Sequence, residues 1–264
     1  MRLLFVGFGT VAQGLSELLV EKKNELLCEH DLAWKAVGIV DMLKGSWHNP
    51  DGIDLVEAMD MVEEGRSLSD AESGGCDWDA PTMIQRTDAD VMLEATYTDI
   101  TSGLPATDHI RAALASGMHV ATTNKGPLAL HSRELLGLAA KNDVQFLYEG
   151  TVMAGTPLLN LVRETLAGSE ISEMKGILNG TTNYILSEME GGKDYESALT
   201  RAQELGYAEA VPDADVLGWD SLAKVTILAN TMFGASLTPG DSPCEGITVI
   251  TPSDIETAAS KGQR

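Results

Sequence analysis

The sequence predicts an α/β protein: an N-terminal doubly wound parallel sheet followed by a second, α+β domain. Short apolar runs alternate with helical patterns up to residue 148, and this alternation is typical of a parallel sheet with helices on both faces. A glycine-rich turn joins the first apolar run directly to the first helical pattern. After about Thr151 the pattern changes to a series of helices. The length of 264 residues suits one large or two small domains.

Five short apolar runs predict the strands of the first domain. They are Leu3–Val6, Ala36–Val40, Asp90–Ala95, His119–Thr122 and Val144–Tyr148. Apolar residues at helical spacing predict the intervening helices, which are Val11 to about Leu27, Leu55–Val62, Ile110–Ser116 and Leu135–Lys141. Residues 44–82 are polar, acidic and glycine-rich, and Leu55–Val62 is the only helix or strand predicted in this segment.

We place the domain boundary near residues 135–155, with domains over residues 1–140 and 141–264. In the second domain, one apolar run, Ser172–Leu178, predicts a strand. The predicted helices are Pro157–Ala167, Asn183–Glu190, Tyr195–Leu205, Trp219–Met232 and Pro252–Lys261.

The charge of the chain limits its partners. Lys and Arg total 18 against 40 Asp and Glu, for a formal net charge of −22. This charge argues against nucleic acid and anionic membranes as partners. Because the acids are spread along the whole chain, we favour a halophilic surface, hydrated in concentrated salt, over recognition of a basic partner.

Other features of the sequence indicate a cytoplasmic protein. No uncharged apolar run approaches the roughly 20 residues of a membrane helix, and the N-terminus reaches Gly7 too early for a signal peptide. The three cysteines, Cys28, Cys76 and Cys244, lie far apart without CxxC spacing, so we expect reduced thiols.

The turn after the first strand carries the motif Gly7-x-Gly9-x-x-Ala12. In a Rossmann-type domain the first glycine permits a tight turn, the second lets the backbone approach a pyrophosphate, and a small third residue allows close packing. The phosphates would lie at the helix N-terminus. We therefore predict a dinucleotide-binding turn, formed by Gly7, Phe8, Gly9, Thr10 and Val11; the alternative is a purely structural turn.

Asp41 ends the second strand, where an acid can accept hydrogen bonds from the adenosine ribose. This position would favour NAD over NADP. Lys44 lies three residues later and can instead meet a 2′-phosphate. With 19 aspartates in the chain, the place of Asp41 can also be accidental.

Two lysines stand out in a chain that has few. Lys125 follows the fourth strand, at the sheet edge where ligands bind, and can reach a cofactor or a substrate carboxylate. Asp220 and Lys224 are four residues apart on one predicted helix face. A partly desolvated lysine there can transfer protons, and nearby acids such as Asp215 can bind a substrate ammonium. The alternatives are an exposed loop lysine, a solvated ion pair and a general acidic surface.

Several segments together resemble homoserine dehydrogenase, in the order of that family and over nearly the whole chain. The segments are Val6–Val11, Glu94–Thr96, Thr123–Ala129, Tyr148–Pro157, Gly176–Leu186 and Gly206–Lys224. The stretch Leu178–Asn183 is the most specific of them. The resemblance implies reversible NAD(P)-dependent interconversion of L-homoserine and L-aspartate 4-semialdehyde, in threonine, methionine and isoleucine biosynthesis.

The resemblance also implies roles for particular residues. Lys224 matches the residue that exchanges a proton with the substrate oxygen, and Glu209 and Asp220 match substrate-binding acids. Thr96 and Lys125 match cofactor-contacting positions. A loop for a monovalent cation, namely sodium, is matched by Glu149, Val152, Ala154 and Thr156, which offer oxygen ligands suited to such an ion.

The resemblance further implies a homodimer with a small-molecule substrate. Family members continue beyond Gly246–Ile250 with further strands and a helix, so we expect the sequence to be truncated. Two other functions stay open: a non-catalytic NAD(P)-binding relative, and a dehydrogenase of another amino acid. The motif Asn179–Asn183 argues against the second of these.

Overall fold

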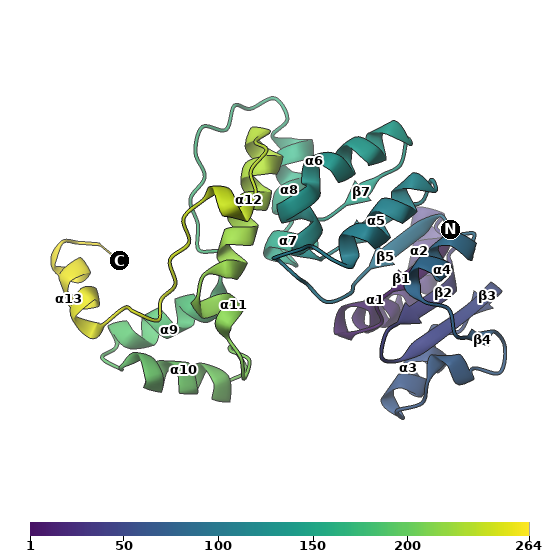
Figure 1. Cartoon of the computed structure of the whole chain (residues 1–264), viewed down its shortest axis with the longest axis horizontal. Coiled ribbons are helices and arrows are strands. Elements are labelled where there is room, and N and C mark those ends of the chain that lie inside the picture. Colours follow the sequence, from purple (N-terminus) through teal and green to yellow (C-terminus); the bar gives the residue numbers. More distant parts are fainter. Residues whose placement is uncertain (264) are drawn as a thin grey trace. The chain divides into compact units, whose positions relative to one another are not determined.

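The computed structural model describes residues 1–263, which form two compact units, Met1–Pro157 and residues 158–263 (Figure 1). The sequence placed the start of the second domain at residue 141. Residues 141–157 instead belong to the first unit, and they include strand β7, Phe146–Leu147, which pairs in parallel with β6.

A seven-stranded sheet forms the centre of the first unit, in the order β4-β3-β2-β1-β5-β6-β7. Its strands are β1 (Arg2–Val6), β2 (Lys35–Asp41), β3 (Gly45–Ile53), β4 (Gly75–Cys76), β5 (Val91–Glu94), β6 (His119–Thr122) and β7. The five predicted strands are all present and pair in parallel around β1. The predicted doubly wound sheet is therefore confirmed.

The antiparallel strands β3 and β4 were missed, and they extend the sheet beyond β2. Their residues, GSWHNPDGI and GC, carry no apolar alternation. Only a few positions of β3 are buried, among them Ser46 and Trp47. Pairing with β2 therefore makes this segment a strand, and local sequence preference does not.

Helices cover both faces of the sheet. They are α1 (Thr10–Glu21), α2 (Lys23–His30), α3 (Leu55–Glu63), α4 (Ala80–Arg86), α5 (Ala106–Ala115), α6 (Lys125–Lys141) and the single turn α7 (Gly150–Met153), with a 3₁₀ turn at Leu68–Asp70. Helices α1 and α3 pack together on one face, while α4, α5 and α6 pack in sequence on the other. A buried core that includes Phe5, Phe8, Ile39 and Trp47 fills the α1–α3 side.

Several predicted helices have different limits in the structure. The first one breaks at Lys22, whose φ of −93° and ψ of 11° separate α1 from α2. Helix α6 begins ten residues before the predicted Leu135, because the Asn124 side chain accepts from Gly126 N and caps the helix. A kink at His131 lies between the buried first turns and the amphipathic second half.

The described residues of the second unit are helical or irregular. The elements are α8 (Leu158–Asn160), a π-helical turn (Leu161–Thr165), α9 (Gly180–Glu190), α10 (Tyr195–Glu204), α11 (Asp213–Val216), α12 (Trp219–Phe233), a 3₁₀ turn (Pro239–Asp241) and α13 (Pro252–Ser260). The predicted strand Ser172–Leu178 is irregular, because this unit has no strand up to residue 263 with which it can pair. Helices α9, α10 and α11 enclose a small core around Ile185 and Met189.

None of the helices in residues 1–263 has both the length and the apolar character needed to cross a bilayer. Cys28, Cys76 and Cys244 are all free thiols.

Candidate active site

The glycine-rich turn lies between β1 and α1 and leaves the start of α1 open. Gly7 has a φ of +87° and its N–H donates to Val40 O at 2.8 Å. A Cβ atom on Gly7 would lie 2.5 Å from Ala95 O, so only glycine fits there. A Cβ on Gly9 would meet no heavy atom within 4 Å, and Gly9 caps α1 without any side-chain hydrogen bond. The unpaired N–H groups of the first helical turn are therefore accessible to an anion.

Asp41 joins the end of β2 to the glycine-rich turn. Its carboxylate accepts from Phe8 N at 2.8 Å, from Leu43 N at 2.9 Å and from Lys44 N at 3.1 Å. Lys44 Nζ lies 3.7 Å from the same carboxylate. Partial burial acts to raise the pKa of Asp41, but the three N–H donors and the Lys44 charge outweigh it and hold that pKa below its usual value. The group is therefore ionised at neutral pH.

A buried polar network connects the carboxyl ends of β5 and β6. Glu94 accepts from Thr96 N at 3.0 Å and from the Thr96 hydroxyl through one oxygen, and from the Thr122 hydroxyl at 2.6 Å through the other. Thr122 Oγ1 in turn accepts from Asn124 N at 2.9 Å, and the Asn124 amide donates to Tyr97 O at 3.0 Å. The network was not predicted, because its members are distant in sequence and meet only through strand pairing.

This network fixes the two turns that hold predicted site residues. Thr96 lies in the turn after β5, and Lys125 is the first residue of α6, directly after the capping Asn124. Glu94 is 2% exposed, and burial raises its pKa despite the hydrogen bonds from Thr122 and Thr96. A buried acid thus orders the edge of the sheet where Lys125 begins its helix.

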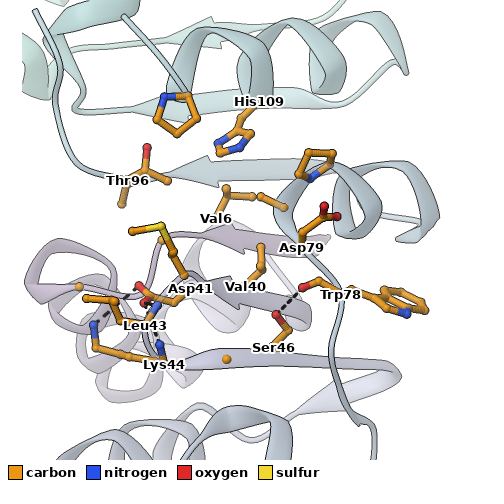
Figure 2. A pocket seen from close by; sticks show the side chains of 18 of the residues that line it. Val6, Val40, Asp41, Leu43, Lys44, Ser46, Trp78, Asp79, Thr96 and His109 are labelled. Carbon is orange, nitrogen blue, oxygen red and sulfur yellow. Dashed lines mark hydrogen bonds and ion pairs between the residues drawn. The ribbon is translucent and has the colours of Figure 1, made fainter.

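A cavity of about 740 Å³ opens at this edge, around the glycine-rich turn and between the ends of β2 and β5 (Figure 2). Gly7, Gly9, Asp41 and Thr96 line it, together with the stretch from Met42 to Ser46. Its other wall consists of residues that the sequence did not single out, among them Trp78, Asp79, Pro81, Pro105 and His109. Little in the sequence indicated these residues. Trp78 and Asp79 lie in the polar segment 44–82, and His109 directly precedes the predicted start of its helix at Ile110.

The second unit holds a compact cluster around the Asp220–Lys224 pair on α12. Lys224 Nζ lies 2.7 Å from Asp220 Oδ2 and donates to Leu178 O at 2.7 Å. Both side chains are only 14% exposed, so the solvated ion pair that the sequence allowed is wrong. Leu222 and Leu228 on the same helix are buried, whereas Leu217 and Val225 are 40% and 46% exposed.

Asn179 links this pair to a second acid. Its amide donates to Asp215 Oδ1 at 2.6 Å and to Asp220 Oδ2 at 2.9 Å, while its oxygen accepts from Thr182 N at 2.8 Å and caps α9. The fold thus brings together Asp215, Asp220 and Lys224 from two helices. Glu209 lies on an exposed segment before α11, and no hydrogen bond or ion pair within residues 1–263 joins its carboxylate to the cluster.

The loop predicted to hold a cation surrounds the single helical turn α7. Glu149 precedes this turn, Val152 lies within it, and Ala154 ends it with a φ of +42°. Thr156 follows this turn and is exposed to solvent, and its N–H donates to Met153 O at 2.9 Å. In the described part of the chain, no group of three or more His, Cys, Asp or Glu side chains is arranged to hold a metal.

Comparison with known proteins matches nearly the whole chain. Residues 7–149 match the family model described as homoserine dehydrogenase, NAD binding domain, and residues 157–264 match the homoserine dehydrogenase model. An NAD⁺-dependent homoserine dehydrogenase from Pseudomonas canavaninivorans is 43% identical over all of this chain and 75% of its own length. A homoserine dehydrogenase from Methanocaldococcus jannaschii is 40% identical over 99% of this chain and 78% of its own length.

Solved structures agree with these sequence matches. A crystal structure of an Archaeoglobus fulgidus protein superposes with a TM-score of 0.86 at 39% identity, over 99% of this chain and 77% of that one. A hyperthermophilic archaeal homoserine dehydrogenase in complex with NADPH has a TM-score of 0.81 at 27% identity, over 95% of this chain and 75% of that one. The chain belongs to the homoserine dehydrogenase family of NAD(P)-dependent oxidoreductases.

Proposed function

We propose that the protein interconverts L-homoserine and L-aspartate 4-semialdehyde with NAD(P), as a step of threonine, methionine and isoleucine biosynthesis. The observation that carries this proposal is the partly buried cluster of Lys224, Asp220, Asn179 and Asp215 in a chain of this family. Such a cluster offers one proton donor and acidic groups for an amino-acid substrate. The cofactor, when bound, supplies the nicotinamide that gives or takes the hydride.

Lys224 is the group that we propose to exchange a proton with the substrate oxygen. An ammonium has three N–H donors, and two of those on Lys224 are directed at Asp220 and Leu178 O. The third can reach the oxygen of the semialdehyde and donate its proton as that oxygen becomes a hydroxyl. In the reverse direction, the neutral amine accepts the hydroxyl proton of homoserine. Asp220, 2.7 Å away, holds the lysine in place.

We assign the remaining acids to the substrate ammonium. Asp215 and Asp220 share the Asn179 amide, so both carboxylates are held near Lys224. Glu209 precedes this cluster on an exposed segment, and we retain it as a substrate-binding candidate. On the first unit, we assign Thr96 and Lys125 to the cofactor, and Lys125 to the substrate as well, because the Glu94 network fixes both of their turns.

The turn Gly7, Phe8, Gly9, Thr10 and Val11 is the proposed pyrophosphate site, with Asp41 at the adenosine ribose. We propose that Asp41 makes NAD the preferred cofactor, because an ionised carboxylate accepts from ribose hydroxyls and repels a 2′-phosphate. Lys44 offsets part of this repulsion. The ratio of kcat/KM for NAD over NADP should therefore fall in Asp41→Asn and rise in Lys44→Ala.

We also propose a monovalent-cation loop at Glu149, Val152, Ala154 and Thr156. The last carbonyls of a helical turn have no partner inside the helix, and together with one carboxylate they form a set of hard oxygen ligands. Sodium is the expected ion. Its role would be structural, holding the segment that ends the first unit.

A cytoplasmic homodimer is the proposed working form. Free thiols in all three cysteines agree with a reducing compartment. Large apolar side chains on the second unit, such as Ile177, Val211 and Val249, are about 70% exposed and suit an interface between copies. Light scattering on the purified protein tests the oligomeric state.

The decisive test compares Lys224→Ala with Lys175→Ala. Lys175 lies in the same unit, but its side chain is 80% exposed and pairs only with Glu173. Oxidation of homoserine, measured with each cofactor in low and high salt, should fall by at least about 100-fold in Lys224→Ala, as is typical for loss of a general acid or base. Cofactor affinity should be unchanged in both variants. Near-normal turnover in Lys224→Ala would refute the assignment.

A further inference from the structure

One buried side chain in the wall of the large cavity has an unsatisfied nitrogen. His109 lies on α5, is 7% exposed, and lines the cavity near Thr96 (Figure 2). Its Nδ1 atom is buried and has no hydrogen-bond partner within residues 1–263. Buried polar atoms in native proteins nearly always have a partner. A partner for His109 must therefore come from outside the chain.

The place of its residue in the cavity wall distinguishes this nitrogen from the other unpaired atoms. Arg2 Nε and Trp34 Nε1 are also buried without a partner, but neither residue lines the cavity. The wall beside His109 is largely apolar and includes Pro105, Pro81 and Trp78. A flat heterocycle with polar atoms on its edge fits such a wall, because its faces contact apolar side chains and its edge reaches the imidazole.

The order of groups in a dinucleotide identifies the heterocycle. The cavity is lined by Gly7 and Gly9 at the open start of α1, by Asp41 at the end of β2, and by the wall that contains His109. A pyrophosphate at Gly9 and a ribose at Asp41 leave that wall for the adenine base.

We propose that His109 hydrogen-bonds the adenine base of the bound dinucleotide and so fixes the adenosine half of the cofactor. This inference rests on the cofactor site proposed above. It gives a binding role to α5, a helix that contributes none of the sequence-predicted site residues.

The chemistry of the imidazole suits this role. Burial lowers the pKa of His109, and the charges of Asp108 and Asp79 only partly oppose that shift, so the ring is neutral at pH 7. A neutral imidazole has one donor and one acceptor nitrogen. Adenine has a donor amino group beside acceptor ring nitrogens, so either nitrogen of His109 can pair with it. A half-turn of the ring about its Cβ–Cγ bond brings the buried nitrogen to the opposite side.

The test uses two substitutions and three ligands. His109→Phe keeps an aromatic ring but has no nitrogen, while His109→Asn places an amide near the position of Nδ1. The ligands are NADH, ADP-ribose, and reduced nicotinamide mononucleotide, which has no adenosine. Dissociation constants are measured by calorimetry on the full chain.

We expect His109→Phe to weaken binding of NADH and ADP-ribose about tenfold, as for loss of one hydrogen bond in a desolvated site, with little change for the mononucleotide. His109→Asn should recover most of the affinity. Without ligand, His109→Phe should melt no lower than the wild type, because neither of the two ring nitrogens that it removes has a hydrogen-bond partner within residues 1–263.

Three results would overturn the inference. They are an unchanged affinity of His109→Phe for NADH and ADP-ribose, an equal loss for all three ligands, and a wild type that binds neither adenine ligand. If His109→Phe does not fold, His109→Leu takes its place against His109→Asn. A wild type that binds NADH but does not oxidise homoserine contradicts the proposed function alone, and the same dissociation constants still decide the role of His109.

Discussion

At the scale of single residues, Gly7 and Gly9 have different physical reasons for being glycine. Gly7 has a positive φ, and its place against Ala95 leaves no room for a side chain. Gly9 has an ordinary φ of −80° and open space where a Cβ would lie. The motif GxG therefore combines a glycine needed for folding with a glycine that keeps space for a ligand.

Substitution of each glycine by valine should separate these two roles. Gly9→Val should weaken cofactor binding at least about 100-fold by filling the pyrophosphate space, yet lower the free energy of unfolding by no more than about 1 kcal/mol. Gly7→Val should lower that free energy by about 3 kcal/mol, through strain at positive φ and the clash with Ala95. Calorimetric binding and urea denaturation measure the two effects. An unchanged dissociation constant in Gly9→Val would show that the turn is only structural.

Glu94 makes a prediction about pH. Its pKa in the folded protein is raised by burial above that of the unfolded chain. The sign follows from linkage: protonated Glu94 favours the folded state, and this contribution is lost as the pH rises through the folded-state pKa. Glu94→Gln has no such ionisation, so the melting temperature of the variant minus that of the wild type should increase from pH 4, below the ordinary pKa of a glutamate, to pH 8. A constant difference over this range would contradict the raised pKa.

At the scale of elements, helix caps connect stability with the site. Asn124 caps α6 and Asn179 caps α9. Each of these asparagines also makes a hydrogen bond outside its own helix. Asn124 holds the turn after β5, and Asn179 holds the two acids near Lys224. The position where each helix begins is therefore determined by the same side chain that orders the site.

Two caps in the second unit form a matched pair for a test. Asn179 caps α9 and bonds Asp215 and Asp220, whereas Asp194 caps α10 through Ser197 N at an exposed place. Alanine at either position should lower the free energy of unfolding by about 1 kcal/mol, the usual effect of losing a cap. Only Asn179→Ala should also lower kcat. Equal turnover in the two variants, measured by homoserine oxidation, would separate Asn179 from the reaction.

At the scale of the whole molecule, the dominant feature is the net charge of −22. Unscreened like charges destabilise the compact state. The Debye length falls from about 10 Å in ~0.1 M salt to about 3 Å in ~1 M salt, so repulsion between neighbouring acids is largely removed over this range. Salt also weakens attractive ion pairs, but most of the described pairs lie at the surface, where each contributes little to stability.

We therefore expect the melting temperature to rise steeply from ~0.1 M to ~1 M potassium chloride, if the protein is halophilic. Sulfate should act in the same direction as chloride. A response to sulfate alone would indicate ordinary exclusion effects on apolar burial. A melting temperature that is flat or falls in chloride would leave the acidity to another cause, such as a basic partner.

The sequence by itself determined the parallel core of the first unit and most helices, because apolar spacing and glycine turns are local signals. Resemblance and residue type together indicated Lys224, Asp220 and Thr96. The early start of α6 is encoded locally by the Asn124 cap, which apolar spacing does not detect. The tertiary structure alone decided β3 and the irregular segment 171–178, because strand pairing depends on neighbours in space. It also decided the environment of Glu94 and His109. Their burial and the presence or absence of hydrogen-bond partners are properties of the packed sheet edge, which no local pattern in the sequence encodes.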